Sequence, residues 1–200
     1  MKRDSKSVGR SSLSVAPIAI ASRGAAFLIP ICVAIWFGVG TVTDAWFWAL
    51  AFPTFAVVLS GSAVATTIVP ALARIRRESP MELGQTVGSL VAWTGLFSLA
   101  MGLAVCLGAP WVLENFTRFD PETQSLASNF LWELLPFMVI NCSGSVLRAG
   151  CEVHGQFKRV AVAPLLRAIV VIGFTALLLG PAGAHALPWG LVAGEAIQFL

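Results

Sequence analysis

Residues 83–107 read LGQTVGSLVAWTGLFSLAMGLAVCL, a run of 25 residues without a charged side chain. An α-helix of this length rises about 37 Å, which exceeds the roughly 30 Å of hydrocarbon in a bilayer. The whole chain has the same character, because 57% of its 200 residues are hydrophobic and 12% are charged. In an ordinary soluble domain about 45–50% of the residues are apolar and about 25% are charged. The sequence therefore predicts an all-α integral membrane protein.

Charged residues divide the chain into six apolar segments, which predict about six transmembrane helices: Leu13–Phe37, Ala45–Ala73, Leu83–Leu107, Ser125–Leu147, Val160–Leu179 and Leu187–Leu200. Residues 1–12 are expected to form a cytoplasmic tail and residues 13–200 a transmembrane helical lobe. The sixth segment has 14 residues, which as a helix cover only about 21 Å. We therefore expect the chain to be the N-terminal part of a longer protein, incomplete in the sixth helix.

The basic residues predict the orientation, since cytoplasmic loops carry an excess of Lys and Arg. With the N-terminus inside, ten of the thirteen basic residues fall in inside segments and only Arg118 falls in an outside loop. The other two, Arg23 and Arg167, lie within predicted spans. Six of the seven tryptophans fall toward the outside, as expected of a residue that favours the bilayer–water interface. We expect a multi-pass protein with a cytoplasmic N-terminus.

No motif indicates an enzyme. The chain lacks the GxxxxGK[ST] phosphate loop, the GxSxG nucleophile turn and the HExxH metal motif. Its four cysteines have no zinc-site spacing. The formal net charge of +3, without basic residues interleaved with aromatics, does not indicate a nucleic-acid partner. We expect a protein that works by binding and movement, with no catalytic residues, metal or cofactor.

Arginines at membrane depth are the main candidates for function, because an ionisable group inside a span costs several kcal/mol unless it faces a polar cavity or a partner. Arg23 lies about ten residues into the first span, where its guanidinium could bind phosphate through two parallel hydrogen bonds. A structural ion pair is the alternative. Arg167 lies about seven residues into the fifth span, so it could line the cavity or extend to the inner interface.

Three acidic residues complete the candidate set. Asp44 is expected immediately before the second span, where it could cap the helix and also line the cavity. Glu133 and Glu195 lie several residues inside the outer ends of the fourth and sixth spans. Either could pair with an arginine or take up a proton during transport, and extension to the outer interface is the alternative.

The sequence around the first turn resembles one known family. Ser22-Arg23, the stretch FGVGTVTDAWF at residues 37–47, Pro53 and Val69-Pro70 are similar to the opening of the MurJ/MviN lipid II flippases. These belong to the wider group of multidrug, oligosaccharidyl-lipid and polysaccharide exporters. Further similarities follow in the same order, at Pro136, residues 144–157, Ala163-Pro164, Leu187-Pro188-Trp189-Gly190, Gly194 and Gln198.

The resemblance implies a fold of about fourteen helices in two lobes, of which this chain would supply most of the first and a missing C-terminal lobe the rest. It implies that an undecaprenyl-pyrophosphate-linked glycan is flipped across a bacterial inner membrane by alternating access. Arg23 and Asp44 match residues of the family's cavity. The family usually has charged residues where this chain has Phe27–Pro30, Val57-Val58 and Gly61, so a less positive cavity is expected here.

Two other functions are consistent with the sequence. One is a proton- or sodium-coupled exporter of small organic cations, in which Asp44, Glu133 or Glu195 would be the coupling carboxylates. The other is a non-transporting membrane scaffold that interacts with cell-wall synthesis enzymes. In every case the membrane lipids are partners.

Overall fold

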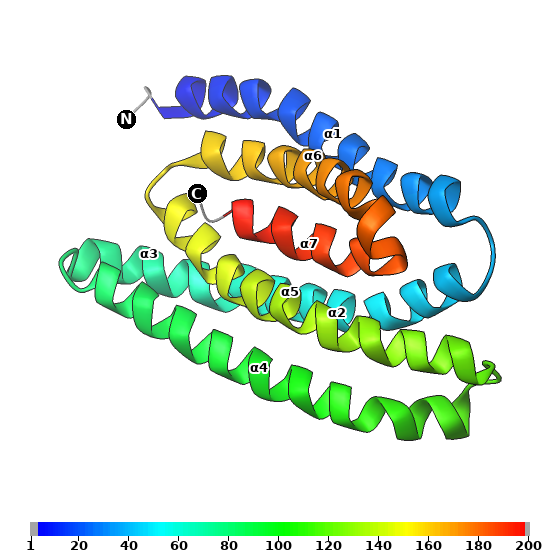
Figure 1. Cartoon of the computed structure of the whole chain (residues 1–200). Coiled ribbons are helices and arrows are strands. Elements are labelled where there is room, and N and C mark those ends of the chain that lie inside the picture. Colours follow the sequence, from blue (N-terminus) through cyan, green and yellow to red (C-terminus); the bar gives the residue numbers. More distant parts are fainter. Residues whose placement is uncertain (1–3, 199–200) are drawn as a thin grey trace.

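The computed structural model describes the backbone of residues 4–198 and the side chains of residues 17, 20–156 and 159–198. All regular structure in this part of the chain is helical (Figure 1), so the all-α prediction is confirmed. The elements are α1 (Asp4–Phe37), α2 (Thr41–Ala63), the π-helical turn η1 (Val64–Ile68), α3 (Val69–Glu78), α4 (Leu83–Phe116), α5 (Pro121–Val153), α6 (Phe157–Ala182), the 3-10 turn η2 (Gly183–His185) and α7 (Ala186–Ile197).

Five helical stretches in the described residues are long and apolar enough to cross a membrane: Ile20–Phe37, Thr41–Glu78, Leu83–Phe116, Pro121–Val153 and Arg159–Ile197. The last stretch contains both α6 and α7, which fold back on each other at η2 (Figure 1). The sixth predicted segment is therefore present as α7, whose 12 residues rise about 18 Å. Together these helices confirm an integral membrane protein of the predicted class.

Several helices extend beyond the predicted segments. Residues 4–12, expected to be a tail, belong to α1, and α5 continues past Leu147 to Val153. The predictions follow the hydrocarbon boundary, whereas a helix continues through polar residues until a glycine, a proline or a cap ends it. At the end of α5 this residue is Gly155, which has a φ of 79°.

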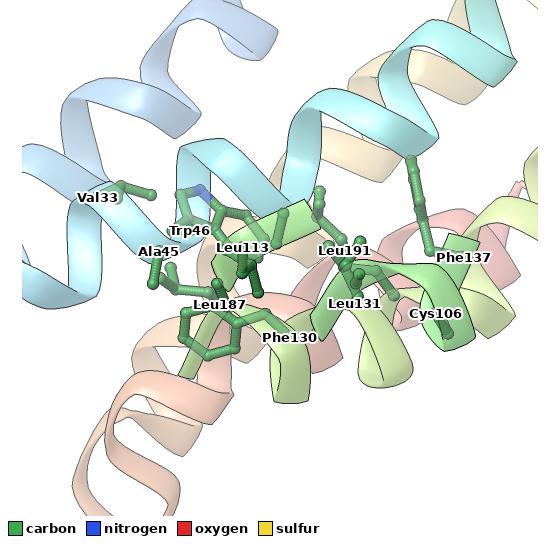
Figure 2. Packing of buried hydrophobic residues seen from close by; sticks show 14 of the residues in the cluster. Val33, Ala45, Trp46, Cys106, Leu113, Phe130, Leu131, Phe137, Leu187 and Leu191 are labelled. Atoms are coloured by element: carbon green, nitrogen blue, oxygen red, sulfur yellow. The ribbon is translucent and has the colours of Figure 1, made fainter. Parts of the chain in front are cut away.

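Helix α5 lies at the centre of the bundle. In its apolar 18-residue segment 61% of the residues are buried, against 11–17% in the corresponding segments of the other four stretches. It packs against α2, α4 and α7, while α1 lies along α6. Figure 2 shows the main core, where Trp46 of α2 meets Phe130 of α5 edge-to-face at 5.8 Å between ring centroids. The outer faces of α1, α2 and α4 carry exposed large apolar side chains, as lipid contact requires.

The turns alternate between the two ends of the bundle (Figure 1). One end holds the α3–α4 and α5–α6 turns, together with Arg74, Arg76, Arg77 and Arg159. We call it the basic end. There Arg76 donates a hydrogen bond to the carbonyl of Val153, which joins α3 to α5. The opposite end holds the α1–α2 and α4–α5 turns and η2.

The α4–α5 turn ends in a capped helix start. Asp120 occupies the N-cap of α5, where its carboxylate accepts hydrogen bonds from the hydroxyl of Thr123 at 2.5 Å and from its amide at 3.2 Å. The hydroxyl, and after it the amide, lower the pKa of Asp120 below its ordinary value. The cap fixes the point at which α5 enters the bundle.

The α6–α7 hairpin depends on small residues. Gly190 and Gly194 lie four residues apart on α7, so both face α6. A Cβ atom at Gly190 would overlap Thr175 Oγ1 and lie 3.2 Å from the carbonyl oxygen of Val171. A Cβ atom at Gly194 would lie 3.0 Å from the carbonyl oxygen of Arg167. Glycines at these positions let the two helix backbones approach closely, as small residues do between transmembrane helices.

Candidate functional site: a buried carboxylate between two arginines

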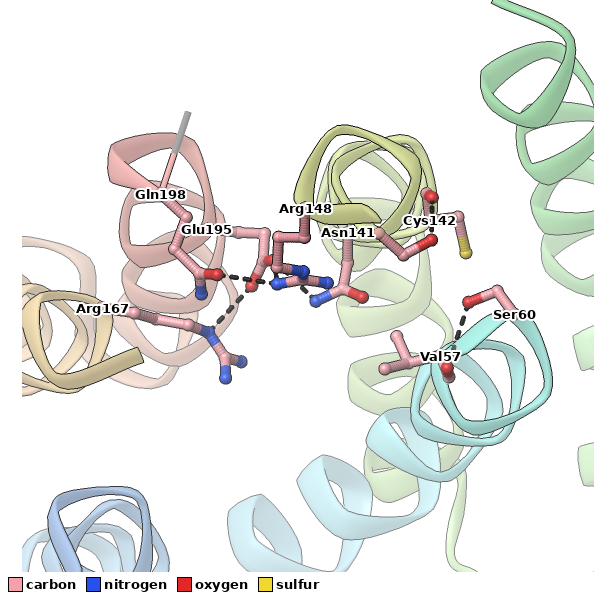
Figure 3. Close-up of polar contacts among 9 residues, drawn as sticks. Val57, Ser60, Asn141, Cys142, Arg148, Arg167, Glu195 and Gln198 are labelled. Carbon is pink, nitrogen blue, oxygen red and sulfur yellow. Dashed lines mark hydrogen bonds and ion pairs between the residues drawn. The ribbon is translucent and has the colours of Figure 1, made fainter. Parts of the chain in front are cut away.

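Glu195 of α7 is fully buried, with 0% of its surface exposed, and charged groups from α5 and α6 surround it (Figure 3). Its Oε2 lies 2.8 Å from Nε of Arg167, and its Oε1 accepts a 2.6 Å hydrogen bond from Nδ2 of Asn141. Nη1 of Arg148 lies 3.8 Å from the same Oε1. We call these four residues the carboxylate cluster, which ties α5, α6 and α7 together.

Helix periodicity places the two α5 members of the cluster. Asn141 and Arg148 are seven residues apart, close to two helical turns, so both face α7. Arg148 Nη1 also donates a 2.7 Å hydrogen bond to Oε1 of Gln198, which secures the end of α7. About a third of the Arg148 side chain remains exposed.

The Arg167 guanidinium is held at one edge only. Its Nε forms an ion pair with Oε2 of Glu195. Neither of these two atoms makes a hydrogen bond within the described residues. The guanidinium carbon lies 5.7 Å from the centroid of the Phe137 ring, a cation–π distance. In Figure 3 the two terminal nitrogens point away from Glu195. A quarter of the side chain is exposed.

The cluster carries a formal charge of +1, since one carboxylate faces two arginines. A buried charge that loses its partner typically destabilises a protein by about 3–5 kcal/mol. Within the cluster, Glu195 is the fully buried charge, and the two partly exposed arginines compensate for it.

A cavity of about 560 Å³ opens beside the cluster between α5, α6 and α7. Its walls are mainly apolar, with Leu147 and Leu166 among them, and its charged residues are Arg148, Arg159 and Glu195. Chemically, such a cavity suits a molecule with both an apolar and an anionic part.

Arg23 and Asp44 lie apart from this cluster and from each other. Arg23 is exposed on α1, about 21 Å along the helix from Phe37, whereas Asp44 is in the first turn of α2. No carboxylate lies within 4.0 Å of the Arg23 guanidinium in the described part of the chain. Its neighbour Ser22 is buried and donates a 3.2 Å hydrogen bond to the Ala161 carbonyl of α6.

The expected cap at Asp44 is wrong. Helix α2 begins three residues earlier, at Thr41, with Gly40 at its N-cap and no side-chain hydrogen bond there. Gly38 and Gly40, with φ angles of 67° and 156°, allow this tight turn. The Asp44 carboxylate is exposed, so it stays a candidate for binding alone.

Glu133 pairs with a histidine that the sequence does not single out. Its Oε1 lies 2.7 Å from Nδ1 of His185 in η2, and the His185 ring packs edge-to-face on Phe130 at 5.8 Å. The pair lies toward the end opposite the basic end, and it holds the α6–α7 turn against α5.

Sequence reasoning does not single out three residues around Glu195 as site residues. They are Asn141 and Arg148 of the carboxylate cluster, and Gln198, which bonds to Arg148. Arg148 is placed in an inside loop because it follows the apolar segment, whereas α5 continues through it. Asn141 is uncharged and attracts no attention at membrane depth, and Gln198 is noted only as a similarity to the family. The available signal is the seven-residue spacing of Asn141 and Arg148, which puts two polar groups on one face of an apolar helix.

Membrane-length helices with a buried carboxylate paired to arginines between them define a polytopic membrane protein. A family model described as "Lipid II flippase MurJ" matches residues 33–200, so the chain belongs to the MurJ family and the predicted resemblance is confirmed. A probable lipid II flippase MurJ from Synechocystis sp. is 27% identical over 219 aligned positions, which cover 96% of this chain and 40% of the relative. The chain thus spans about two fifths of the length of this curated relative.

Proposed function

We propose that the complete protein flips a pyrophosphate-linked polyprenyl glycan, a precursor of the bacterial cell wall, from the cytoplasmic to the outer leaflet by alternating access. The environment of Arg23 is the observation that carries this proposal. It is an exposed cation on a membrane-spanning helix, with no carboxylate partner in the described residues. Such a group is costly in hydrocarbon, and an anionic head group that enters from the cytoplasm would compensate for its charge.

Three residues are proposed to contact the substrate: Arg23, Arg167 and Asp44. The arginines suit the phosphates, because a guanidinium can donate paired hydrogen bonds to phosphate oxygens. Asp44 lies near the opposite end of the bundle, where its carboxylate can accept hydrogen bonds from sugar hydroxyls. Flipping breaks no covalent bond, so we propose a transporter and not an enzyme.

Glu133 is the better of the two candidate coupling carboxylates. It is partly exposed and bonded to a histidine, the side chain whose ordinary pKa lies closest to neutrality. Glu195, by contrast, is fully buried and already paired with two arginines.

The proposed function is tested by complementation. Cells depleted of their own lipid II flippase are expected to grow when they express the complete protein from a plasmid, because the supply of precursor to the outer leaflet is restored. Failure to restore growth, with the protein present in the membrane, would contradict the proposal. Reduced accumulation of a cationic dye in such non-growing cells would instead favour the small-cation exporter.

The proposed orientation places the basic end in the cytoplasm. The test uses the complete protein with its native cysteines replaced by serine and one new cysteine introduced, either Met81→Cys in the α3–α4 turn or Arg118→Cys in the α4–α5 turn. Both side chains are exposed. A membrane-impermeant thiol reagent is expected to label Arg118→Cys in intact cells and Met81→Cys only after permeabilisation. The reverse pattern would contradict this orientation.

A further inference from the structure

We infer that Glu195 is a positioning residue: it holds Arg167 by its Nε edge so that the two terminal nitrogens of the guanidinium bind a phosphate group of the lipid-linked substrate. This inference rests on the proposed function and adds a residue that acts on the substrate through another. It assigns Asn141 the role of fixing the Glu195 carboxylate.

The first support is the geometry of the guanidinium. Arginine has five N–H donors in a planar fork. Here Nε faces Oε2 of Glu195 at 2.8 Å, and the terminal nitrogens point to the other side (Figure 3). Two parallel hydrogen bonds to a phosphate need two adjacent N–H groups, which the terminal edge supplies while the ion pair is intact.

The second support is that burial and Asn141 hold the carboxylate in place. Glu195 is fully buried, and its Oε1 is fixed by the 2.6 Å hydrogen bond from Asn141. On the other side the Phe137 ring lies 5.7 Å from the guanidinium carbon of Arg167. Arg167 is therefore held by a charged group and by an aromatic face at once, and little conformational freedom remains to be lost when a ligand binds.

The third support is the charge that remains after pairing. Arg148 approaches the same carboxylate at 3.8 Å, so Glu195 is shared between two cations. The cluster keeps a formal charge of +1, and Arg167 retains attraction for an anion. A quarter of its side chain is exposed.

The fourth support is that Arg167 and Arg23 lie at similar positions along the axis of the bundle. Helices α1 and α6 run side by side in the same direction (Figure 1), and the Ser22–Ala161 hydrogen bond aligns them. Arg167 is six residues beyond Ala161 and Arg23 is one residue beyond Ser22. At 1.5 Å per residue the two arginines differ by only about 8 Å along the axis, so a head group with two phosphates meets both levels.

The test is a thermodynamic cycle on binding. A short-chain polyprenyl pyrophosphate is titrated into the purified complete protein in detergent, for the wild type, Arg167→Gln, Glu195→Gln and the double variant. Loss of a hydrogen bond to a charged group usually weakens binding about tenfold or more, which is expected for Arg167→Gln. Glu195→Gln is expected to weaken binding about tenfold in the wild-type background and not at all in the Arg167→Gln background.

Two controls separate positioning from a structural role. The uncharged polyprenol of the same length is expected to bind all four proteins equally, because it has no phosphate for Arg167. Glu114→Gln, the same change at an exposed position of α4, is expected to leave affinity for the pyrophosphate unchanged. Arg167→Lys keeps the charge but not the paired nitrogens, so it is expected to bind the pyrophosphate several-fold more weakly even if Glu195→Gln does not fold.

The outcomes are distinguishable. If Glu195→Gln weakens binding as much without Arg167 as with it, or if Arg167→Lys binds like the wild type, the positioning role is overturned while the proposed function stands. If the wild type itself binds the pyrophosphate no more tightly than the uncharged polyprenol, the proposed function fails as well.

Discussion

Arg23→Ala is expected to abolish the growth of flippase-depleted cells that depend on the complete protein, while the amount of protein in the membrane stays unchanged. The side chain is exposed and makes no ion pair with the described residues, so its loss leaves no partner unsatisfied. Loss of one charge-assisted hydrogen bond to the phosphate costs about 1.5–3 kcal/mol of binding free energy. This corresponds to at least a tenfold loss of affinity. Colony formation and immunoblots of membrane fractions measure the two quantities.

Two matched variants sharpen this prediction. Arg118→Ala removes an exposed arginine from the α4–α5 turn, outside the spans, and is expected to support normal growth. Arg23→Lys keeps the charge without the planar fork, and partial growth is expected. Normal growth with Arg23→Ala at equal abundance would remove Arg23 from the substrate site.

Gly190→Val is expected to prevent α7 from packing on α6. A side chain at this position overlaps Thr175 Oγ1 and presses on the Val171 carbonyl, and backbone cannot give way as a flexible side chain does. Forcing extra atoms into a packed contact costs typically about 1–3 kcal/mol and sometimes more. Because the carboxylate cluster depends on α7, we expect less folded protein, a lower Tm and loss of transport together.

The control for this steric effect lies on α6. Gly173 has open space where a Cβ atom would stand, so Gly173→Val is expected to leave Tm and abundance close to wild type. Gly190→Ala combined with Thr175→Ala removes the overlapping hydroxyl and is expected to recover most of the stability that Gly190→Ala alone loses. A wild-type Tm for Gly190→Val would show that the close α6–α7 contact is not required.

The membrane-spanning part of the fold could be predicted because a bilayer imposes one dominant rule. Long charge-free runs such as residues 83–107 are difficult to place anywhere but in hydrocarbon, and the alternation of basic turns fixes which turns share an end. The helix ends could not be predicted in the same way. Helix α4 continues to Phe116 and α5 to Val153, because polar residues outside the hydrocarbon are as compatible with a helix as apolar ones.

The candidate site could be predicted residue by residue but not as an arrangement. Charge at membrane depth singles out Arg167 and Glu195 separately, since each is costly alone. Their pairing depends on the α6–α7 hairpin and on the two glycines that bring its helices together, which are tertiary facts. Arg148 joins them only because α5 is longer than its apolar segment.

The most direct test of the central claim is transport by purified protein. The complete protein is reconstituted into liposomes with a fluorescent polyprenyl-pyrophosphate glycan in both leaflets, and an impermeant quencher reports how fast the inner-leaflet probe reaches the outside. The account predicts rapid movement with the wild type, and with Arg23→Ala a rate no faster than protein-free liposomes. Equal rates for the wild type and Arg23→Ala, or no movement with either, would contradict it.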